Sequence, residues 1–284
     1  MFVEDINGSY SNKYVVNVQT ESLILLADYI KNLYTSQGSN GLYYHTSSLA
    51  NSAVDNSYRY SGSNPNNYVC FGSDASTCPS DNLYRIIGVF GNQVKLIKNT
   101  SLGNYYWSGS SSNQSNTWSS STLNTGTLNG TYLSGLSITW QNKIATTSWK
   151  VGGMSYNDSY TAKNYYDREV GSSSSSTTYS AKIGLMYVSD YGFAASPSYW
   201  TTALFDYYNV AYRSDWMYIG LREWTISPYS SYSNRAFFVD LNGYVTNGNG
   251  VYYNSYGVRP VFYITSSTTY VSGSGTESDP FRIE

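Results

Sequence analysis

The chain has 284 residues and a formal net charge of −2, and only 12% of its residues are charged. Its 33 Tyr, 48 Ser, 27 Asn and 24 Gly residues make up nearly half of the sequence. The lack of a basic excess excludes general nucleic-acid binding. No apolar run approaches the roughly 20 residues that span a bilayer, and an aromatic content of 17% excludes ordinary disorder.

Residues 1–57 are predicted as a helical and extended N-terminal segment that packs on the main domain. Residues 1–5 lack the basic start and apolar stretch of a signal peptide, which fits a piece of a longer exported protein. Residues 22–34 form the clearest predicted helix, with Thr20 or Ser22 as its cap. Its apolar positions follow the spacing of one buried helical face: Leu23, Leu26, Ala27, Ile30 and Leu33.

Residues 58–284 are predicted as one β-rich domain with a few helices and long loops. The apolar runs 82–90 and 94–98, separated by a short turn, predict a β-hairpin. Residues 118–150 predict a second, weaker helical region, and residues 181–188 predict another strand. Long loops in a compact domain are usually functional, so the loops are where we expect a binding site.

The two cysteines, Cys70 and Cys78, are separated by seven residues that include Gly, Ser and Asp. We expect a small disulfide-closed loop, which suits an oxidising, extracytoplasmic setting. The alternative is two free thiols. A metal site is disfavoured, because the single histidine, His45, is distant in sequence and two thiolates do not complete a zinc sphere.

Catalytic motifs are not found in the sequence. His45 lies near no nucleophile motif, and there is no G-x-S-x-G, H-E-x-x-H or phosphate-loop pattern. Scattered carboxylates such as Asp158, Asp167 and Glu169 leave paired-carboxylate glycoside hydrolysis open, although no motif surrounds them. We therefore expect a protein that is not an enzyme and that carries no cofactor.

The segment 199–256 holds 11 of the chain's tyrosines in 58 positions, interspersed with Ser, Asn, Asp and Arg. This is the residue set of antibody-like binding surfaces, in which Tyr supplies rigid contact area and small polar residues supply hydrogen bonds. The alternative is that the tyrosines pack the core, which fits Tyr218, Tyr244 and Tyr263 best. The adjacent pairs 207–208 and 252–253 fit the core poorly, because neighbouring strand residues point to opposite faces.

We therefore predict a ligand-binding surface within 199–256. Its predicted aromatic residues are Tyr199, Tyr207, Tyr208, Tyr212, Tyr229, Tyr232, Tyr252 and Tyr253. Its predicted hydrogen-bonding residues are Asp206, Asn209, Arg213, Asp215, Asn234, Asn247 and Asn254.

Two short motifs resemble known folds. Residues 216–224 (WMYIGLREW) resemble the Trp-Ile-Gly-Leu core strand of C-type lectin domains, and residues 256–262 (YGVRPVF) resemble the closing strand of formylglycine-generating-enzyme-like and lectin-fold proteins. The resemblance implies an α+β, C-type lectin-like fold. It also implies that Arg259 hydrogen-bonds backbone carbonyls. The framework residues it implies are Trp216, Trp224, Arg259 and Phe262.

Most of residues 58–264 resembles surface or exported proteins of gut Firmicutes and their phages, through pieces such as YRYSG, LYRIIGVF and GLMYVSDYG. The pattern is also similar to variable proteins of diversity-generating retroelements, in which a C-terminal segment of a lectin-type fold is diversified. The resemblance implies a cell-surface or virion-associated receptor or adhesin whose partner is a protein or glycan on another surface.

Two known activities of the resembling families are not carried over. The Glu-Pro-Asn and Trp-Asn-Asp motifs of calcium-dependent sugar binding are absent, as are the paired C-terminal active-site cysteines of formylglycine-generating enzymes. The alternatives to a diversified receptor are a carbohydrate-binding adhesin of fixed specificity and a structural surface or pilus-associated protein.

Overall fold

The chain folds as a mixed α+β, strand-rich structure with few helices, and the sequence prediction is confirmed at this level. The structure is a computed structural model that describes residues 23–111, 114–209, 211–254 and 256–284. Thr20 and Ser22, the predicted helix caps, lie outside these residues.

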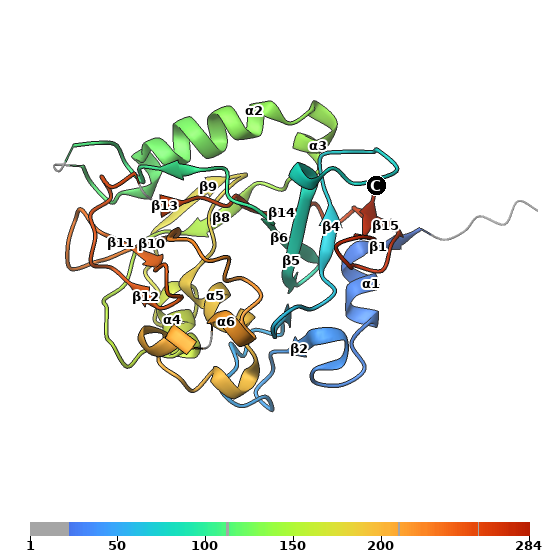
Figure 1. Cartoon of the computed structure of the whole chain (residues 1–284), viewed down its shortest axis with the longest axis horizontal. Coiled ribbons are helices and arrows are strands. Elements are labelled where there is room, and N and C mark those ends of the chain that lie inside the picture. Colours follow the sequence, from blue (N-terminus) through green and yellow to red (C-terminus); the bar gives the residue numbers. More distant parts are fainter. Residues whose placement is uncertain (1–22, 112–113, 210, 255) are drawn as a thin grey trace, which may run out of the picture.

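The strands are short and distributed along the whole described chain (Figure 1). Their bounds are β1 (Ile24–Leu25), β2 (Leu42–Tyr44), β3 (Tyr58–Tyr60), β4 (Tyr68–Cys70), β5 (Leu83–Phe90), β6 (Gln93–Lys98), β7 (Asn104–Tyr105), β8 (Thr147–Lys150), β9 (Thr178–Ala181), β10 (Glu223–Pro228), β11 (Ala236–Val239), β12 (Val245–Thr246), β13 (Tyr256–Gly257), β14 (Val261–Tyr263), β15 (Thr269–Ser272) and β16 (Arg282–Ile283).

The helical elements include regular α-helices and several single turns. The α-helices are α1 (Leu26–Asn32), α2 (Leu133–Gly135), α3 (Ile138–Asn142), α4 (Ala162–Glu169), α5 (Val188–Ala194) and α6 (Ala211–Ser214). The 3-10 turns are η1 (Ser39–Gly41), η2 (Ser80–Asn82), η3 (Trp118–Ser120), η5 (Pro197–Tyr199) and η6 (Leu204–Asn209), and η4 (Leu123–Tyr132) is a π-helix.

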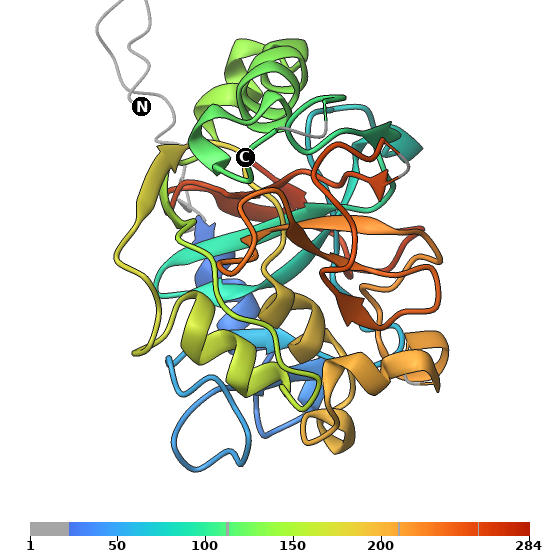
Figure 2. The ribbon, with the colours of Figure 1, turned by 90° about the vertical axis from the view of Figure 1, so that its left-hand side faces the viewer.

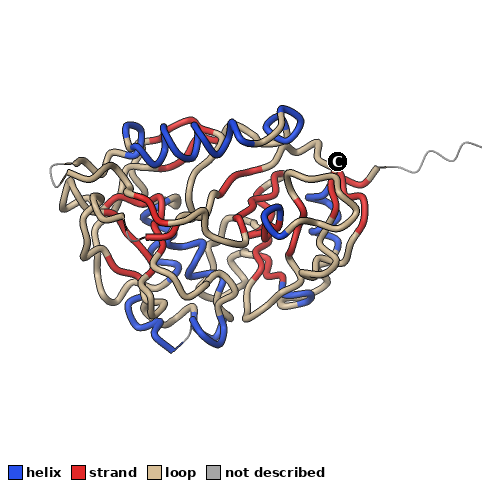
Figure 3. The backbone as a smooth tube through the Cα atoms, turned by 45° about the horizontal axis from the view of Figure 1, so that its top comes forward, coloured by secondary structure: helices blue, strands red, loops and turns tan. Residues whose placement is uncertain are grey.

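Two larger sheets organise the described chain. One has the strand order β14-β6-β5-β3-β2, with β4 also paired to β5, and the other has the order β12-β11-β10-β13-β7. Figure 3 shows these strands as two groups, and the helix formed by η4 and α2 runs along the outside of the molecule. Smaller sheets join β1, β15 and β16, and β8 with β9. The N-terminal part contributes an edge strand to the first sheet, because β2 pairs with β3.

The predicted hairpin is confirmed. Strands β5 and β6 pair antiparallel and connect at Gly91 and Asn92. A bulge between Ile86 and Gly88 shifts their register. Gly88 is required there, because a Cβ atom at this position would lie 2.3 Å from the backbone oxygen of Tyr58 on β3.

The predicted N-terminal helix is confirmed but is shorter than its pattern. Helix α1 buries Leu26, Ala27 and Ile30 against the core, as the spacing requires. Leu23 precedes the helix and is 74% exposed, so it does not belong to the buried face.

The second helical region, 118–150, is confirmed up to Asn142, through η3, η4, α2 and α3. Leu123 and Leu128 of η4 are both fully buried, and their separation of five residues matches the i→i+5 period of a π-helix. The last residues of this region form β8 instead of a helix, and β8 pairs with β9.

The strand prediction for residues 181–188 is wrong. Strand β9 ends at Ala181, Gly184 forms an isolated bridge with Val261, and α5 begins at Val188. Every residue of α5 is buried, including the polar Ser189 and Asp190, so the helix has no exposed polar face and no helical period marks it in the sequence. The Asp190 carboxylate accepts a hydrogen bond from the Tyr187 backbone N–H at 2.9 Å and fixes the start of the helix.

The predicted disulfide between Cys70 and Cys78 is formed. It ties the end of β4 to the loop that leads into η2. Within the described part of the chain, no helix has the length and apolar character that a membrane span requires.

Candidate functional site

The segment 199–256 builds most of the second sheet and the turns around it. It contributes η6 and α6, followed by β10, β11, β12 and the first residue of β13. Figure 2 shows these orange and red elements next to one another on one side of the molecule. The segment that carries the tyrosine excess therefore forms one continuous region.

Three tyrosines of this segment are exposed. The exposed fractions of Tyr208, Tyr232 and Tyr253 are 42%, 51% and 44%, and they are the largest for any described tyrosine in the segment. Tyr199, Tyr229 and Tyr252 are half-buried.

The exposed rings lie against neighbouring rings. The ring centroids are 4.4 Å apart for Tyr208 and Tyr244, and 4.9 Å apart for Tyr252 and Tyr253. Tyr232 lies 5.5 Å from Tyr229. These separations are those of favourable aromatic pairs, so each exposed ring is held in place by its neighbour.

The prediction that Tyr207 contacts ligand is wrong, because its side chain is fully buried. Its hydroxyl lies 3.3 Å from the Gly192 carbonyl oxygen and 3.2 Å from the Tyr199 carbonyl oxygen, both acceptors inside the protein. Residues 207 and 208 belong to the 3-10 helix η6, in which successive side chains point about 120° apart. One ring of the doublet therefore enters the core and the other leaves it.

Asp215 and Asn247 are also buried, with exposed fractions of 4% and 6%, so neither lies on the open surface as predicted. One Asp215 carboxylate oxygen accepts a hydrogen bond from the Met217 backbone N–H at 2.9 Å. Burial raises the pKa of Asp215 to about 8, because the charged form is penalised away from water. Asp215 thereby stabilises the turn at Trp216 and Met217.

The other predicted polar residues divide by exposure. Asp206, Arg213 and Asn254 are exposed, and Asn234 is half-buried. Asn209 ends η6 and Tyr212 lies in α6, but their side chains lie outside the described structure.

The predicted framework residues are buried. The Trp216 and Trp224 indoles donate to the backbone carbonyls of Tyr60 and Tyr105, at 2.9 and 3.0 Å. Phe262 is fully buried in the first sheet. The two tryptophans thus fix the segment to strands that lie far away in the sequence.

Arg259 donates to a backbone carbonyl, as the resemblance implied, but it also pairs with a carboxylate. Its guanidinium donates two hydrogen bonds to the Glu223 carboxylate, at 2.7 and 2.8 Å, and one to the Met217 carbonyl oxygen at 2.6 Å. Both charged side chains are at most 3% exposed. The Arg259 side chain is therefore part of a buried, bidentate ion pair and is not available to a ligand.

Two residues of the surface were missed by the sequence analysis. Asn116 lies in a loop more than 100 positions upstream, and its Nδ2 is within 3.0 Å of the carbonyl oxygens of Tyr229, Tyr232 and Arg235. The Arg235 guanidinium lies 4.5 Å from the centre of the Tyr232 ring. The turn that contains Tyr232 is thus stabilised by the hydrogen bonds of Asn116 and by the contact of Arg235 with the Tyr232 ring.

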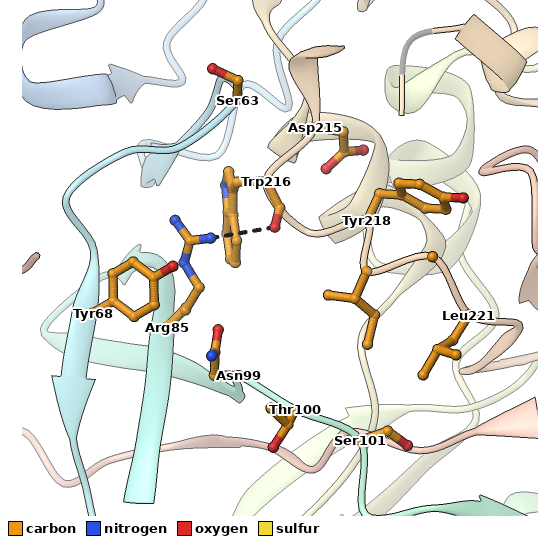
Figure 4. Close-up of a pocket in the computed structure, with 12 residues that line it drawn as sticks. Ser63, Tyr68, Arg85, Asn99, Thr100, Ser101, Asp215, Trp216, Tyr218 and Leu221 are labelled. Carbon is orange, nitrogen blue, oxygen red and sulfur yellow. Dashed lines mark hydrogen bonds between the residues drawn. The ribbon is translucent and has the colours of Figure 1, made fainter. Parts of the chain in front are cut away.

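A cavity of about 690 Å³ with a mixed polar and apolar lining lies beside the frame (Figure 4). The Arg85 guanidinium stands between the rings of Tyr68 and Trp216, 4.3 and 4.6 Å from their centres. Its Nε donates to Asn67 at 2.7 Å, so most of its binding capacity is used inside the protein. The residues that line the cavity are Ser63, Tyr68, Arg85, Asn99, Thr100, Ser101, Asp215, Trp216, Tyr218, Ile219, Gly220 and Leu221.

His45 is buried, and its Nδ1 accepts a hydrogen bond from the Ala53 backbone N–H at 3.1 Å. Burial holds the pKa of His45 well below its usual value, which fits a structural role. Among the described residues, no three His, Cys, Asp or Glu side chains are grouped as metal ligands. Comparisons with protein-family models, curated proteins and solved structures find no match to this chain.

Proposed function

We propose that this chain is a non-enzymatic binding protein of receptor or adhesin type with a C-type lectin-like fold. Its ligand would be a protein or glycan on another cell or surface. The binding surface would consist of the exposed tyrosines Tyr208, Tyr232 and Tyr253 and the polar side chains between them. The chain itself would be displayed outside the cell or on a virion.

The observation that carries this proposal is the division of the tyrosines within one segment. Tyr207 and Tyr256 are almost completely buried, whereas Tyr208 and Tyr253 are exposed and rest against other rings. Exposing large aromatic side chains to water is unfavourable, and these side chains bury their apolar area only when a partner binds. A solvent-exposed aromatic surface on a buried aromatic frame is the arrangement that a binding surface requires.

The frame supports the proposed fold through the contact between its two motifs, although the first motif is a strand only from Glu223 and 216–222 form turns. The two motifs that resemble lectin-type proteins, 216–224 and 256–262, are joined by the Arg259–Glu223 ion pair and by the parallel pairing of β10 with β13. These contacts join the start of β10 to the residues that directly follow the segment 199–256. A constant frame with replaceable surface residues is what a diversified protein would need, because surface substitutions usually change stability by less than about 0.5 kcal/mol.

The test is binding by a variant that lacks the exposed rings. We would measure the binding of labelled protein to a glycan array and to intact gut bacterial cells. Y208S/Y232S/Y253S should lose binding while keeping its fold, because the three rings supply the contact area. The matched control L23S/I138S/V271S removes three exposed apolar side chains elsewhere and should bind like the wild type.

The outcomes separate the alternatives. Selective glycan binding that depends on the tyrosines would favour an adhesin of fixed specificity. Concentration-dependent oligomers in light scattering, without binding to array or cells, would favour a structural surface protein. Equal binding by the wild type and the tyrosine variant would refute the proposed surface.

A further inference from the structure

Lys95 and Asp190 meet in the core and are not part of the proposed binding surface. Lys95 lies on β6 and Asp190 on α5, and 95 positions separate them in the sequence. Their side chains are 1% and 2% exposed, and Lys95 Nζ lies 2.5 Å from Asp190 Oδ2. An amine and a carboxyl group are thus held in contact inside the protein.

The surroundings of this pair are aromatic. Lys95 Nζ lies 4.7 Å from the centre of the Tyr187 ring, 5.4 Å from that of Tyr263 and 5.6 Å from that of Phe90. Burial lowers the pKa of Lys95, because the ammonium form is penalised away from water. A larger fraction of the amine is therefore neutral and nucleophilic than in water.

A second charged pair adjoins the first. Arg59 Nη1 lies 3.5 Å from Asp190 Oδ1, and Arg59 Nη2 lies 2.7 Å from Asp55 Oδ2. The four charges cancel. If Lys95 and Asp190 both lost their charge, Arg59 and Asp55 would still form an ion pair. The net charge of the buried cluster is therefore zero whether Lys95 and Asp190 are charged or neutral.

We propose that Lys95 and Asp190 condense in the folded protein to form an intramolecular isopeptide bond. The Lys95 Nζ–Asp190 Cγ bond forms and the Cγ–Oδ2 bond breaks. Oδ2 takes two protons from the ammonium group and leaves as water, and the amide nitrogen keeps the third. The step is a condensation without change of oxidation state and needs no further reactant.

The neighbours favour this step. The Arg59 guanidinium faces Oδ1, the oxygen on which negative charge grows when the amine attacks the carboxyl carbon. The Tyr187 backbone N–H donates to Oδ2 at 2.9 Å and fixes the carboxyl group in front of the amine. A cavity of about 140 Å³ borders Lys95, Asp190 and Arg59 and gives the released water a place to go. The product replaces two buried charges by a neutral amide.

Intact-protein mass spectrometry after reduction of the disulfide tests the proposal. The wild-type chain should be lighter than its sequence mass by one water molecule, and a protease digest should yield one branched fragment that contains both Lys95 and Asp190. K95R removes the nucleophile but keeps the positive charge, and its mass should equal the mass of its sequence.

The matched control is K98R. Lys98 is 6% exposed and lies on the same strand, but its Nζ donates to the Asp81 backbone carbonyl instead of a carboxylate. K98R should keep the loss of one water. A wild-type mass equal to the sequence mass would overturn the proposal, and that measurement requires no variant to fold. The result is independent of ligand binding by the tyrosine surface.

Discussion

Replacing Tyr207 by Ser tests how the 207–208 doublet is divided between core and surface. The Tyr207 ring is completely buried, and its hydroxyl donates to carbonyl oxygens inside the protein. Truncating a buried aromatic side chain costs about 3–5 kcal/mol, because contacts are lost and a cavity remains. Y207S should therefore lower the free energy of unfolding by about that amount, which is a large part of the stability of a typical domain.

The matched control is Y208S. Tyr208 is 42% exposed and touches Tyr244, so this variant should lose about 1 kcal/mol from the aromatic contact. Both free energies are measured by urea denaturation followed by circular dichroism at neutral pH. Y207S should unfold at a clearly lower urea concentration than Y208S. Equal midpoints would mean that the assignment of Tyr207 to the core is wrong.

Two further predictions concern buried charges. E223Q should lower the free energy of unfolding by about 3–5 kcal/mol, because it leaves the buried Arg259 guanidinium without a counter-charge, and a loss below about 1 kcal/mol in urea denaturation would contradict this. Burial raises the pKa of Asp215 from 3.8 to about 8, so the folded state holds the proton more tightly than the unfolded chain. The stabilising contribution of Asp215 is therefore complete below the unfolded pKa of 3.8 and is lost as the pH rises to about 8. D215N should flatten this fall in urea midpoints measured across the pH range, the exposed-site control D206N should not, and identical pH profiles for D215N and the wild type would refute the assignment.

Features with a local periodic signal could be predicted from the sequence. Helix α1 carries a helical hydrophobic repeat, and the β5–β6 hairpin consists of two apolar, β-branched runs separated by a Gly-Asn turn; the structure follows both signals. Residues 181–194 carry no such signal, because they are almost uniformly apolar and buried. The start of α5 depends on Asp190, which accepts from the Tyr187 N–H, and no strand or helix period reveals that contact.

The segment of the proposed binding surface could be singled out from the sequence, but the exposed residues within it could not be told from the buried ones. The tyrosine excess marked the correct segment as the one with exposed rings, but the doublet argument assumed strand geometry, and η6 is a 3-10 helix. Asn116 was missed because its role depends on three carbonyl groups more than 100 positions away. Only the folded chain brings these groups together.

The central claim is that the exposed face of 199–256 is the binding surface on a fixed frame. It is tested most directly by sequencing sibling copies of this gene and comparing residues 199–256. We expect substitutions to concentrate at exposed positions such as 208, 232 and 253, with Tyr207, Trp216 and Trp224 unchanged. Substitutions spread evenly over buried and exposed positions, or no variation within the segment, would contradict a diversified surface.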